Sequence, residues 1–243
     1  MNAIEITGLT KTFGTRTAVD ALTLSIPQGE LFALLGQNGA GKTTTIRMLS
    51  GTMPPSGGSA LLMGRDIGKE PRAVKSCLNV SPQETAVAPK LSVRENLELM
   101  ARLYGCGRRQ AAEKAEKQLQ AFHLTDRAKE RAKSLSGGMQ RKLSIAMALI
   151  SEPQILFLDE PTLGLDVRAR RDLWKWIEGL KGRITVILTT HYLEEAEALA
   201  DRIGIMSRGR MLALGTADDI KRETGAAALE DAFLRLTDEE VPA

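Results

Sequence analysis

Gly36-Gln37-Asn38-Gly39-Ala40-Gly41-Lys42-Thr43 is the stretch of this sequence that decides the fold. It follows the apolar run 31–35 and precedes a segment with the composition of a helix. Glycines between a strand and a helix let backbone N–H groups turn inward and cradle phosphate oxygens at the helix N-terminus. In such a loop Lys42 would reach the outer phosphates of a nucleotide, and Thr43 would bind Mg²⁺.

A second stretch, Ile155-Leu156-Phe157-Leu158-Asp159-Glu160, ends an apolar run in two carboxylates. Such a run is typical of a strand buried in a parallel sheet, and open α/β sheets bind their ligands at the C-terminal ends of the strands. Asp159 could hold the Mg²⁺ shell there, and Glu160 could activate a water molecule. Together the two stretches predict a nucleotide triphosphatase. A surface turn before an ordinary helix would explain the glycines but not the acidic strand end.

Composition is that of a globular protein with a large domain. The chain has 243 residues, 43% of them hydrophobic, which suffices for a substantial core. With 33 basic and 30 acidic residues the net charge is only +3, so we expect no nucleic-acid partner. The two cysteines, Cys77 and Cys106, lack the spacing of metal ligands and are expected to be reduced.

No targeting segment or membrane span is visible in the sequence. The N-terminus has no basic segment followed by an apolar core, and no stretch approaches the ~20 apolar residues needed to cross a bilayer. We therefore expect a cytoplasmic protein whose link to a membrane comes through a partner.

Strand-like and helical patterns alternate along the chain, which predicts an α/β fold with a mostly parallel sheet. The β-like pieces at 4–6, 22–26 and 59–63 suggest an antiparallel layer on the N-terminal side. From about residue 92 to 150 the pattern is helical, with Val93, Leu97, Met100 and Tyr104 on one face. After Glu160 we expect a helix at 167–180, a strand at 184–188, another helix, a strand at 202–206 and a short polar tail.

These patterns divide a single domain of residues 1–243 into subregions. The nucleotide-binding core with its β layer takes residues 1–90 and 151–215. An inserted helical lobe takes residues 91–150, and a short helical tail takes residues 216–243.

Leu135-Ser136-Gly137-Gly138-Met139-Gln140 stands directly before the helical run 141–150. Ser136 can cap that helix, and the glycines leave its N-terminus open, so the chain offers a second site suited to phosphate. At this point the sequence resembles the ATP-binding-cassette (ABC) ATPases, whose signature is Leu-Ser-Gly-Gly-x-Gln. The resemblance covers essentially the whole chain. The expected motifs occur in order at 36–43, Gln83, 135–140, 155–160, 164–166 and His191.

The resemblance implies a function for each motif. Two cassettes pair head to tail, as a homodimer or with a homologous cassette, and the signature of one contacts the γ-phosphate held by the other. Gln83 senses the Mg²⁺ and the attacking water, Glu160 is the general base, and His191 braces the γ-phosphate and the base. The implied nucleotide-binding residues are Phe13, Gly36, Gln37, Asn38, Gly39, Ala40, Gly41, Lys42, Thr43, Thr44, Ser136, Gly137, Gly138 and Asp166, and the Mg²⁺ set is Thr43, Gln83 and Asp159. Phe13 would stack on adenine, and Asp166 would signal across the dimer.

Some residues have an ordinary structural explanation. His123 lacks any motif context and is expected to be structural, and we expect packing for at least one of Trp174 and Trp176. A lone loop glutamine such as Gln83 is usually only solvated, so its role depends on the joint pattern. For His191, the preceding strand ends at the same sheet edge as Asp159, which favours a functional role.

A cassette without a membrane span implies separate transmembrane permease subunits. Residues 84–104, with apolar Val87, Leu91 and Leu97 near charged Arg94 and Glu95, could line the permease groove, although core packing explains the apolar positions equally well. Residues 78–84 and 228–237 look like those of the exporter branch that handles drugs, polysaccharides or sodium. The cargo would contact the permease and leaves no trace in this chain.

Two alternatives belong to other classes. A soluble cassette ATPase acting on DNA or ribosomes usually carries a long coiled-coil insertion or two cassettes, and neither is found. A GTP-binding switch would need an Asn-Lys-x-Asp motif to read guanine, and the sequence has none.

Overall fold

The computed structural model describes residues 1–238 and contains two β-sheets. The larger sheet has the strand order β10-β9-β3-β8-β7-β6. Its strands are β3 (Leu31–Leu35), β6 (Leu78–Ser81), β7 (Ile155–Asp159), β8 (Thr185–Thr190), β9 (Arg202–Ser207) and β10 (Arg210–Gly215). All neighbouring pairs are parallel except β9 and β10. The prediction of a mostly parallel sheet is confirmed.

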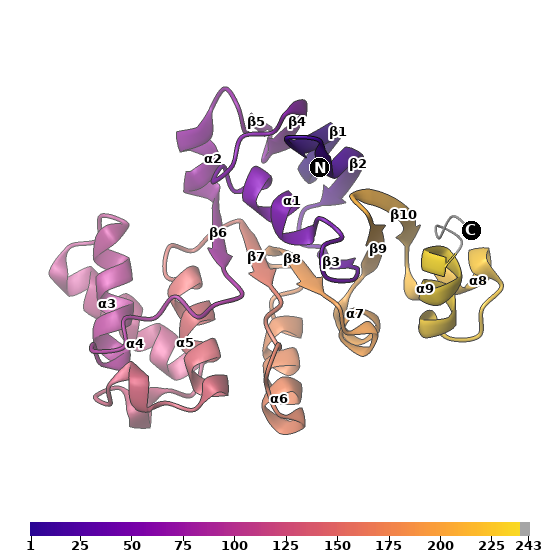
Figure 1. Ribbon diagram of the computed structural model, residues 1–243. Helices are drawn as coiled ribbons and strands as arrows, with labels where there is room; N and C mark the ends of the chain where they lie inside the picture. The colour runs from indigo at the N-terminus through magenta and orange to yellow at the C-terminus, as the bar shows by residue number, and fades with distance from the viewer. Residues whose placement is uncertain (239–243) are drawn as a thin grey trace.

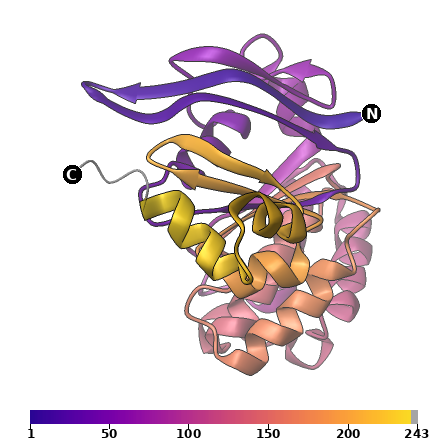
Figure 2. The same ribbon diagram turned by 90° about the vertical axis from the view of Figure 1, so that its right-hand side faces the viewer.

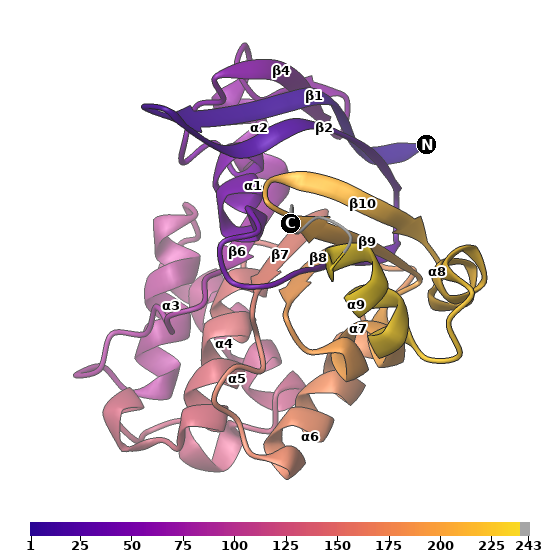
Figure 3. The ribbon, with the colours of Figure 1, turned by 45° about the vertical axis from the view of Figure 1, so that its right-hand side comes forward.

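The smaller sheet is antiparallel and lies above the larger one (Figure 3). It comprises β1 (Asn2–Phe13), β2 (Arg16–Pro27), β4 (Gly57–Leu62) and the short β5 (Arg65–Asp66). Its first two strands are much longer than the pieces at 4–6 and 22–26 suggested. Several register shifts interrupt their pairing, so the alternation of buried and exposed positions is broken along each strand.

Helix α1 (Lys42–Leu49) lies between the two sheets (Figure 3). Its Ile46 and Leu49 share a core with Ile4 of β1 and with Phe32 and Phe157 of the larger sheet. Side chains on a strand alternate between faces, so Leu31 and Leu156 point the other way, into a core with the helical lobe. Burial on both faces explains the unbroken apolar runs of β3 and β7.

The helical lobe stands to one side of the sheets (Figure 1). It contains α3 (Val93–Leu103), α4 (Arg108–Ala121), two short 3₁₀ turns, η1 (Thr125–Arg127) and η2 (Ala132–Ser134), and α5 (Gly137–Leu149). Helix α3 begins with a capping box, in which Ser92 accepts from the backbone of Glu95 and the Glu95 carboxylate accepts from the backbone of Ser92. The inserted lobe predicted between the glutamine and the acidic strand is thus present.

The remaining helices are α2 (Pro71–Cys77), α6 (Val167–Glu178), α7 (Leu193–Leu199), α8 (Ala217–Thr224) and α9 (Leu229–Asp238). Helix α2 connects the smaller sheet to the larger one, and the others follow strands of the larger sheet in the chain. Figure 2 shows α8 and α9 in yellow at the end of the chain. Ile220 and Phe233 of this pair share a core with Ile203 and Ile205 of β9.

Several details differ from the sequence predictions. The prediction puts Tyr104 on one helical face with Val93 and Leu97, but α3 ends at Leu103 and Tyr104 is 46% exposed. Gly105 follows with φ +86°, and this turn takes Tyr104 out of the helical period. The strand β10 lies where only a polar segment was expected after residue 206, whereas α8 and α9 lie within the segment for which a helical tail was predicted. Residues 239–243 of that tail lie outside the described residues.

Within residues 1–238 no helix is long and apolar enough to cross a membrane. Cys77 is buried and Cys106 half-buried, and both are free thiols.

Candidate active site

A cavity of about 510 Å³ opens at the C-terminal ends of β3 and β7. Its walls come from the β1–β2 hairpin, the loop before α1, and the ends of β6 and β7. The lining residues are Phe13, Arg16, Ala18, Asn38, Gly39, Ala40, Gly41, Lys42, Thr43, Thr44, Gln83 and Glu160. Most of the residues predicted to bind the nucleotide therefore gather around a single cavity.

The loop before α1 needs its glycines for shape. Gly41 has φ +107°, and a Cβ on it would lie 2.5 Å from the carbonyl oxygen of Ala18. Gly36 has no room for a side chain either, because a Cβ there would lie 2.3 Å from the carbonyl oxygen of Met206. The loop is thus pressed against neighbouring backbone, and its open side faces the cavity. Gly41 is also the N-cap residue of α1, whose free N–H groups and dipole attract anions.

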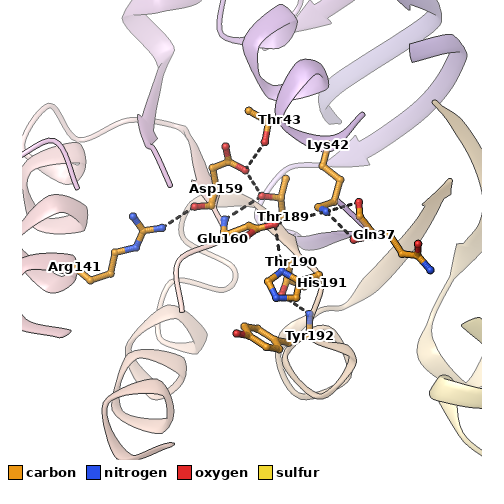
Figure 4. A network of polar contacts seen from close by, with 11 residues as sticks. Gln37, Lys42, Thr43, Arg141, Asp159, Glu160, Thr189, Thr190, His191 and Tyr192 are labelled. Atoms are coloured by element: carbon orange, nitrogen blue, oxygen red, sulfur yellow. Dashed lines mark hydrogen bonds and ion pairs between the residues drawn. The ribbon is translucent and has the colours of Figure 1, made fainter. Parts of the chain in front are cut away.

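Lys42 is a buried cation held by loop carbonyls. Its Nζ donates to the carbonyl oxygens of Gly36 at 2.7 Å and Gln37 at 3.1 Å, and it lies 3.7 Å from Oε1 of Glu160 (Figure 4). Burial lowers the pKa of Lys42, while the nearby carboxylates of Glu160 and Asp159 act in the opposite direction. A bound triphosphate would add negative charge beside this ammonium and stabilise its protonated form.

Asp159 ends β7 within reach of two hydroxyls. Thr43 Oγ1 donates to Oδ1 of Asp159 at 3.3 Å, and Thr189 Oγ1 donates to the same oxygen. Oxygen donors of this type are the ligands that Mg²⁺ prefers, and the cation usually completes its shell with phosphate oxygens and water. The pair Thr43 and Asp159 therefore fits the predicted Mg²⁺ site.

Glu160 has a backbone conformation that is uncommon for its residue type. Its φ is +46°, and its N–H donates to both the carbonyl and the hydroxyl oxygen of Thr189 at 3.1 Å. This turn brings the carboxylate to the cavity wall, where His191 Nδ1 lies 3.3 Å from Oε1 (Figure 4). The His191 ring in turn packs on Tyr192, with the two ring centroids 4.2 Å apart.

Phe13 and Gln83 both line the cavity. The Phe13 ring is 47% exposed at the end of β1, with Lys11 Nζ 5.2 Å from its centroid. Gln83 follows β6 with an exposed side chain. An exposed aromatic face beside a phosphate loop is suited to stacking on a base.

The signature residues do not reach this cavity in the single chain. Among the described residues, Ser136, Gly137, Gly138 and Asp166 are absent from its lining. Ser136 caps α5 by accepting from Met139 N at 3.4 Å, and Asp166 caps α6 by accepting from Ala169 N at 2.9 Å. Both side chains are exposed, as is Gly137.

Three residues near the site lie outside the motifs at 36–43 and 155–160 and were not predicted from the sequence. Arg141 touches the backbone of the acidic strand end, Thr189 holds the Asp159 carboxylate, and Arg16 lines the cavity beside Gly39. For Arg141 the sequence carried no distinct signal, because it begins the run 141–150 directly beside a second cation, Lys142. For Thr189 the signal was its place just before His191 at a strand end. Arg16 carried none, because exposed arginines are common.

His123 and the two tryptophans have structural surroundings. His123 is exposed with φ +54° in the turn after α4. The Trp176 ring packs on Phe122 at 4.0 Å between centroids, and Trp174 Nε1 donates to Oε1 of Glu195 at 2.9 Å.

A parallel sheet with a phosphate loop before α1 and an acidic end on β7 defines a P-loop nucleotide triphosphatase. Similarity to known proteins identifies the family within this class. The family model described as "ABC transporter" matches residues 19–163. The chain is 43% identical to the daunorubicin/doxorubicin resistance ATP-binding protein DrrA of Streptomyces peucetius, over 97% of this chain and 71% of that protein. It is 39% identical to the linearmycin resistance ATP-binding protein LnrL of Bacillus subtilis, over 96% and 74%.

A solved structure described as an ATP-binding subunit of an ABC transporter has a TM-score of 0.86 and 31% identity, and covers 97% of this chain and 99% of that one. This chain belongs to the ABC transporter family. It is an ATP-binding ATPase subunit that acts with a separate permease, and its relatives lie in the drug-exporter branch indicated by residues 78–84 and 228–237. The relatives give no support to the alternative of a soluble ATPase acting on DNA or ribosomes.

Proposed function

We propose that this chain binds ATP with Mg²⁺, hydrolyses it in a head-to-tail dimer of cassettes, and thereby drives export through the permease. The observation that supports this most is the meeting of Lys42, Thr43, Asp159, Glu160 and His191 at a single edge of the sheet. Lys42 and Thr43 come from the start of α1, Asp159 and Glu160 from the end of β7, and His191 from the end of β8. Together they supply a cation, metal ligands, a base and an imidazole at or beside one cavity.

Phosphate binding depends on the loop and α1 together. The N–H groups at the start of α1 and the Lys42 ammonium surround the position of the β- and γ-phosphates. Thr43 and Asp159, with Gln83 of the cavity wall, would hold Mg²⁺. When bound, the metal neutralises phosphate charge and fixes the orientation of the triphosphate. Phe13 would stack on the adenine ring at the mouth.

Proton transfer is the task of Glu160. Its carboxylate takes a proton from the attacking water while the γ-phosphate is transferred to that water. His191, 3.3 Å from the carboxylate, keeps it oriented and can donate a hydrogen bond to the γ-phosphate. Lys42 Nζ lies 3.7 Å from the same carboxylate oxygen and attracts it electrostatically.

The dimer explains why Ser136, Gly137 and Gly138 lie outside the cavity. These residues form an exposed helix N-terminus on the lobe, which suits a γ-phosphate supplied by another chain. The partner cassette is a second copy or a homologue. Asp166, exposed at the start of α6, would report on the partner. In this scheme residues 1–243 form a single ATPase domain, whose core is 1–90 and 151–215, whose lobe is 91–150 and whose tail is 216–243.

The permease contact was predicted on residues 84–104, but several of the residues named there are used within the chain. Leu97 is fully buried, Arg94 pairs with Glu116 at 2.6 Å, and Glu95 belongs to the cap of α3. The exposed apolar residues of this segment are Leu99, Leu103 and Tyr104. We propose that this end of α3 takes part in permease binding, which would hold the chain at the cytoplasmic face of the membrane.

The relatives named above are drug-resistance proteins, and this chain would serve an exporter of similar cargo.

The decisive experiment replaces the proposed base, Glu160. In Glu160→Gln the amide can hold the water but cannot take its proton, so turnover should fall roughly 10²–10⁴-fold while ATP binding is retained. Turnover is measured as phosphate release, and binding by titration with a fluorescent ATP analogue. Near-normal hydrolysis by the purified variant would exclude Glu160 as the base.

A further inference from the structure

Arg141 is a buried cation in the helix that follows the signature. It lies five residues after Ser136 on α5, and its side chain is 4% exposed. Burial lowers the pKa of the Arg141 guanidinium to about 10, although the carboxylates of Asp159, Glu195 and Glu160 act to raise it. Burial of this charge costs desolvation free energy, and hydrogen bonds must compensate for that cost.

All the hydrogen bonds of this guanidinium go to backbone carbonyls. Nη2 donates to Asp159 at 2.7 Å (Figure 4). Nε donates to Pro161 at 2.8 Å, so the two acceptors flank the proposed base in the sequence. Nη1 donates to Gln83 at 3.1 Å and to Pro82. A single side chain therefore joins the loop of Gln83 to the backbone around Glu160.

The planar shape of the guanidinium is what makes this possible. It offers five N–H donors in a fixed fork, whereas a lysine ammonium is a point charge with three donors on a flexible stem. Carbonyl acceptors on opposite sides of the group can be reached by the fork but not by a single nitrogen. Hydrogen bonds from a charged donor are also about twice as strong as neutral ones.

The other end of the same helix carries Ser136. Because α5 is a continuous helix from Gly137 to Leu149, a displacement of Ser136 along the helix axis also moves the Cα of Arg141. We propose that Arg141 is a positioning residue, which sets Gln83 and the backbone of Glu160 in its own chain according to the position of the signature helix. This inference rests on the proposed function of Gln83, Glu160 and the dimer.

A first test separates positioning from binding and from folding. Arg141→Lys keeps the charge but breaks the fork, and we expect kcat to fall roughly 10–100-fold while the affinity for a fluorescent ATP analogue changes less than about threefold. Arg141→Gln is the second variant, used where the lysine variant fails to fold. Lys114→Met is the matched control, since Lys114 also donates to a carbonyl, that of Ile150 at 3.2 Å, but contacts no proposed active-site residue. Its kcat should stay within about twofold of the natural chain.

A second test asks in which chain Arg141 acts. Lys42→Ala chains are mixed with Arg141→Lys chains, so that the single site able to bind ATP has the altered arginine beside its own Glu160. In the opposite arrangement, chains carrying both substitutions are mixed with natural chains. The intact ATP site then belongs to the natural chain, and the altered arginine lies in the other chain, whose signature faces that site. A mixture of natural and Lys42→Ala chains gives the reference rate.

We expect the loss of activity in the first mixture and the reference rate in the second. Equal loss in both, or loss only in the second, would overturn the proposal, as would an Arg141→Lys chain with a kcat within twofold of the natural one. Parallel loss of kcat, ATP affinity and melting temperature in both Arg141 variants would show a purely structural residue and also overturn it. Failure of the underlying dimer scheme is distinguishable, because the reference mixture would then show only the activity of its natural chains.

Discussion

Thr189 shows how much a single hydroxyl contributes at this site. It is fully buried at the end of β8, donates to the Asp159 carboxylate and accepts from the backbone N–H of Glu160 at 3.1 Å. Thr189 thus holds the carboxylate proposed for metal binding and the backbone of the residue proposed as the base. The sequence offered little to single it out, because a threonine in a β-strand is ordinary.

Thr189→Val keeps the shape and removes both hydrogen bonds. We expect the free energy of unfolding to fall by about 1–3 kcal/mol, since two buried hydrogen bonds are lost, and kcat to fall at least tenfold. Thr185→Val is the control. Thr185 lies at the other end of β8, 2% exposed, and accepts from Gly29 N at 3.0 Å. It should lose similar stability in urea unfolding but little kcat per folded molecule, and equal losses of kcat in the two variants would contradict the role of Thr189.

Glu195 makes stability depend on pH. It is fully buried on α7, and burial raises its pKa although the hydrogen bond from Trp174 Nε1 acts to lower it. The folded chain therefore keeps this proton at pH values where the unfolded chain has lost it, and the natural protein loses stability relative to Glu195→Gln as pH rises above about 4.5. Below that pH the difference should level off.

The measurement for Glu195 is urea unfolding of both proteins between pH 4 and 8. Groups other than Glu195 titrate alike in the two chains and cancel in the comparison. The Trp174 indole can still donate to the side-chain carbonyl of the glutamine, so the fold should be kept. A difference in unfolding free energy that is constant over this range would show that burial does not raise the pKa of Glu195.

Helices and strands that are specified by a short apolar run or by a capping residue were predicted well from the sequence. The strands β3, β7 and β8 and the helix α6 lie where their patterns placed them within a few residues. The strand β10 was missed. Its hairpin turns at Arg208 and Gly209, both with positive φ, and arginine is not a residue that signals such a turn. Helix α8 had a readable signal in the capping box of Thr216 and Asp219.

The site residues also differ in how far the sequence predicts them. Residues within the continuous motifs, such as Lys42 and Asp159, could be assigned from their neighbours in sequence. Contacts that depend on tertiary packing could not, and the clearest is Arg141, whose acceptors at Pro82 and Asp159 lie on other elements. The burial of Leu97 and exposure of Leu103 likewise follow from the direction in which α3 faces the lobe core, which periodicity alone leaves open.

The exposed end of α3 gives a prediction for partner binding. Leu103 is 71% exposed and belongs to no core, so Leu103→Glu should leave folding and the ATPase activity of the isolated chain unchanged. If this face binds the permease, an acidic side chain there would be desolvated without a partner, and co-purification from detergent extracts should fall at least fivefold. Arg109→Glu on α4, 94% exposed, is the control and should co-purify normally. Undiminished co-purification of the Leu103 variant would place the permease contact elsewhere.

For the whole molecule, the separation of the signature from the nucleotide cavity leads to a prediction about concentration. Ser136, Gly137 and Gly138 stabilise the γ-phosphate only when a second chain is present, so hydrolysis in dilute solution should rise more steeply than the protein concentration. The specific rate should reach a plateau once the ATP-bound dimer is saturated. A specific rate that is independent of concentration down to nanomolar protein would argue for catalysis by single chains.

Complementation tests the same arrangement without depending on affinity. Ser136→Arg places a long cation on the exposed signature and should block the closed dimer, while the single chain still folds and binds ATP, because Ser136 lies outside its own cavity. Lys42→Ala removes the charge at the phosphates and should weaken ATP binding by about 1.5–3 kcal/mol for each charge-assisted hydrogen bond lost. Each protein alone should be inactive. A mixed dimer then holds one site with an intact loop facing an intact signature and one site broken on both sides, so phosphate release should reappear on mixing, with a maximum near equal amounts. A fully active Ser136→Arg protein, or a mixture with no more activity than its parts, would rule out sites shared between chains.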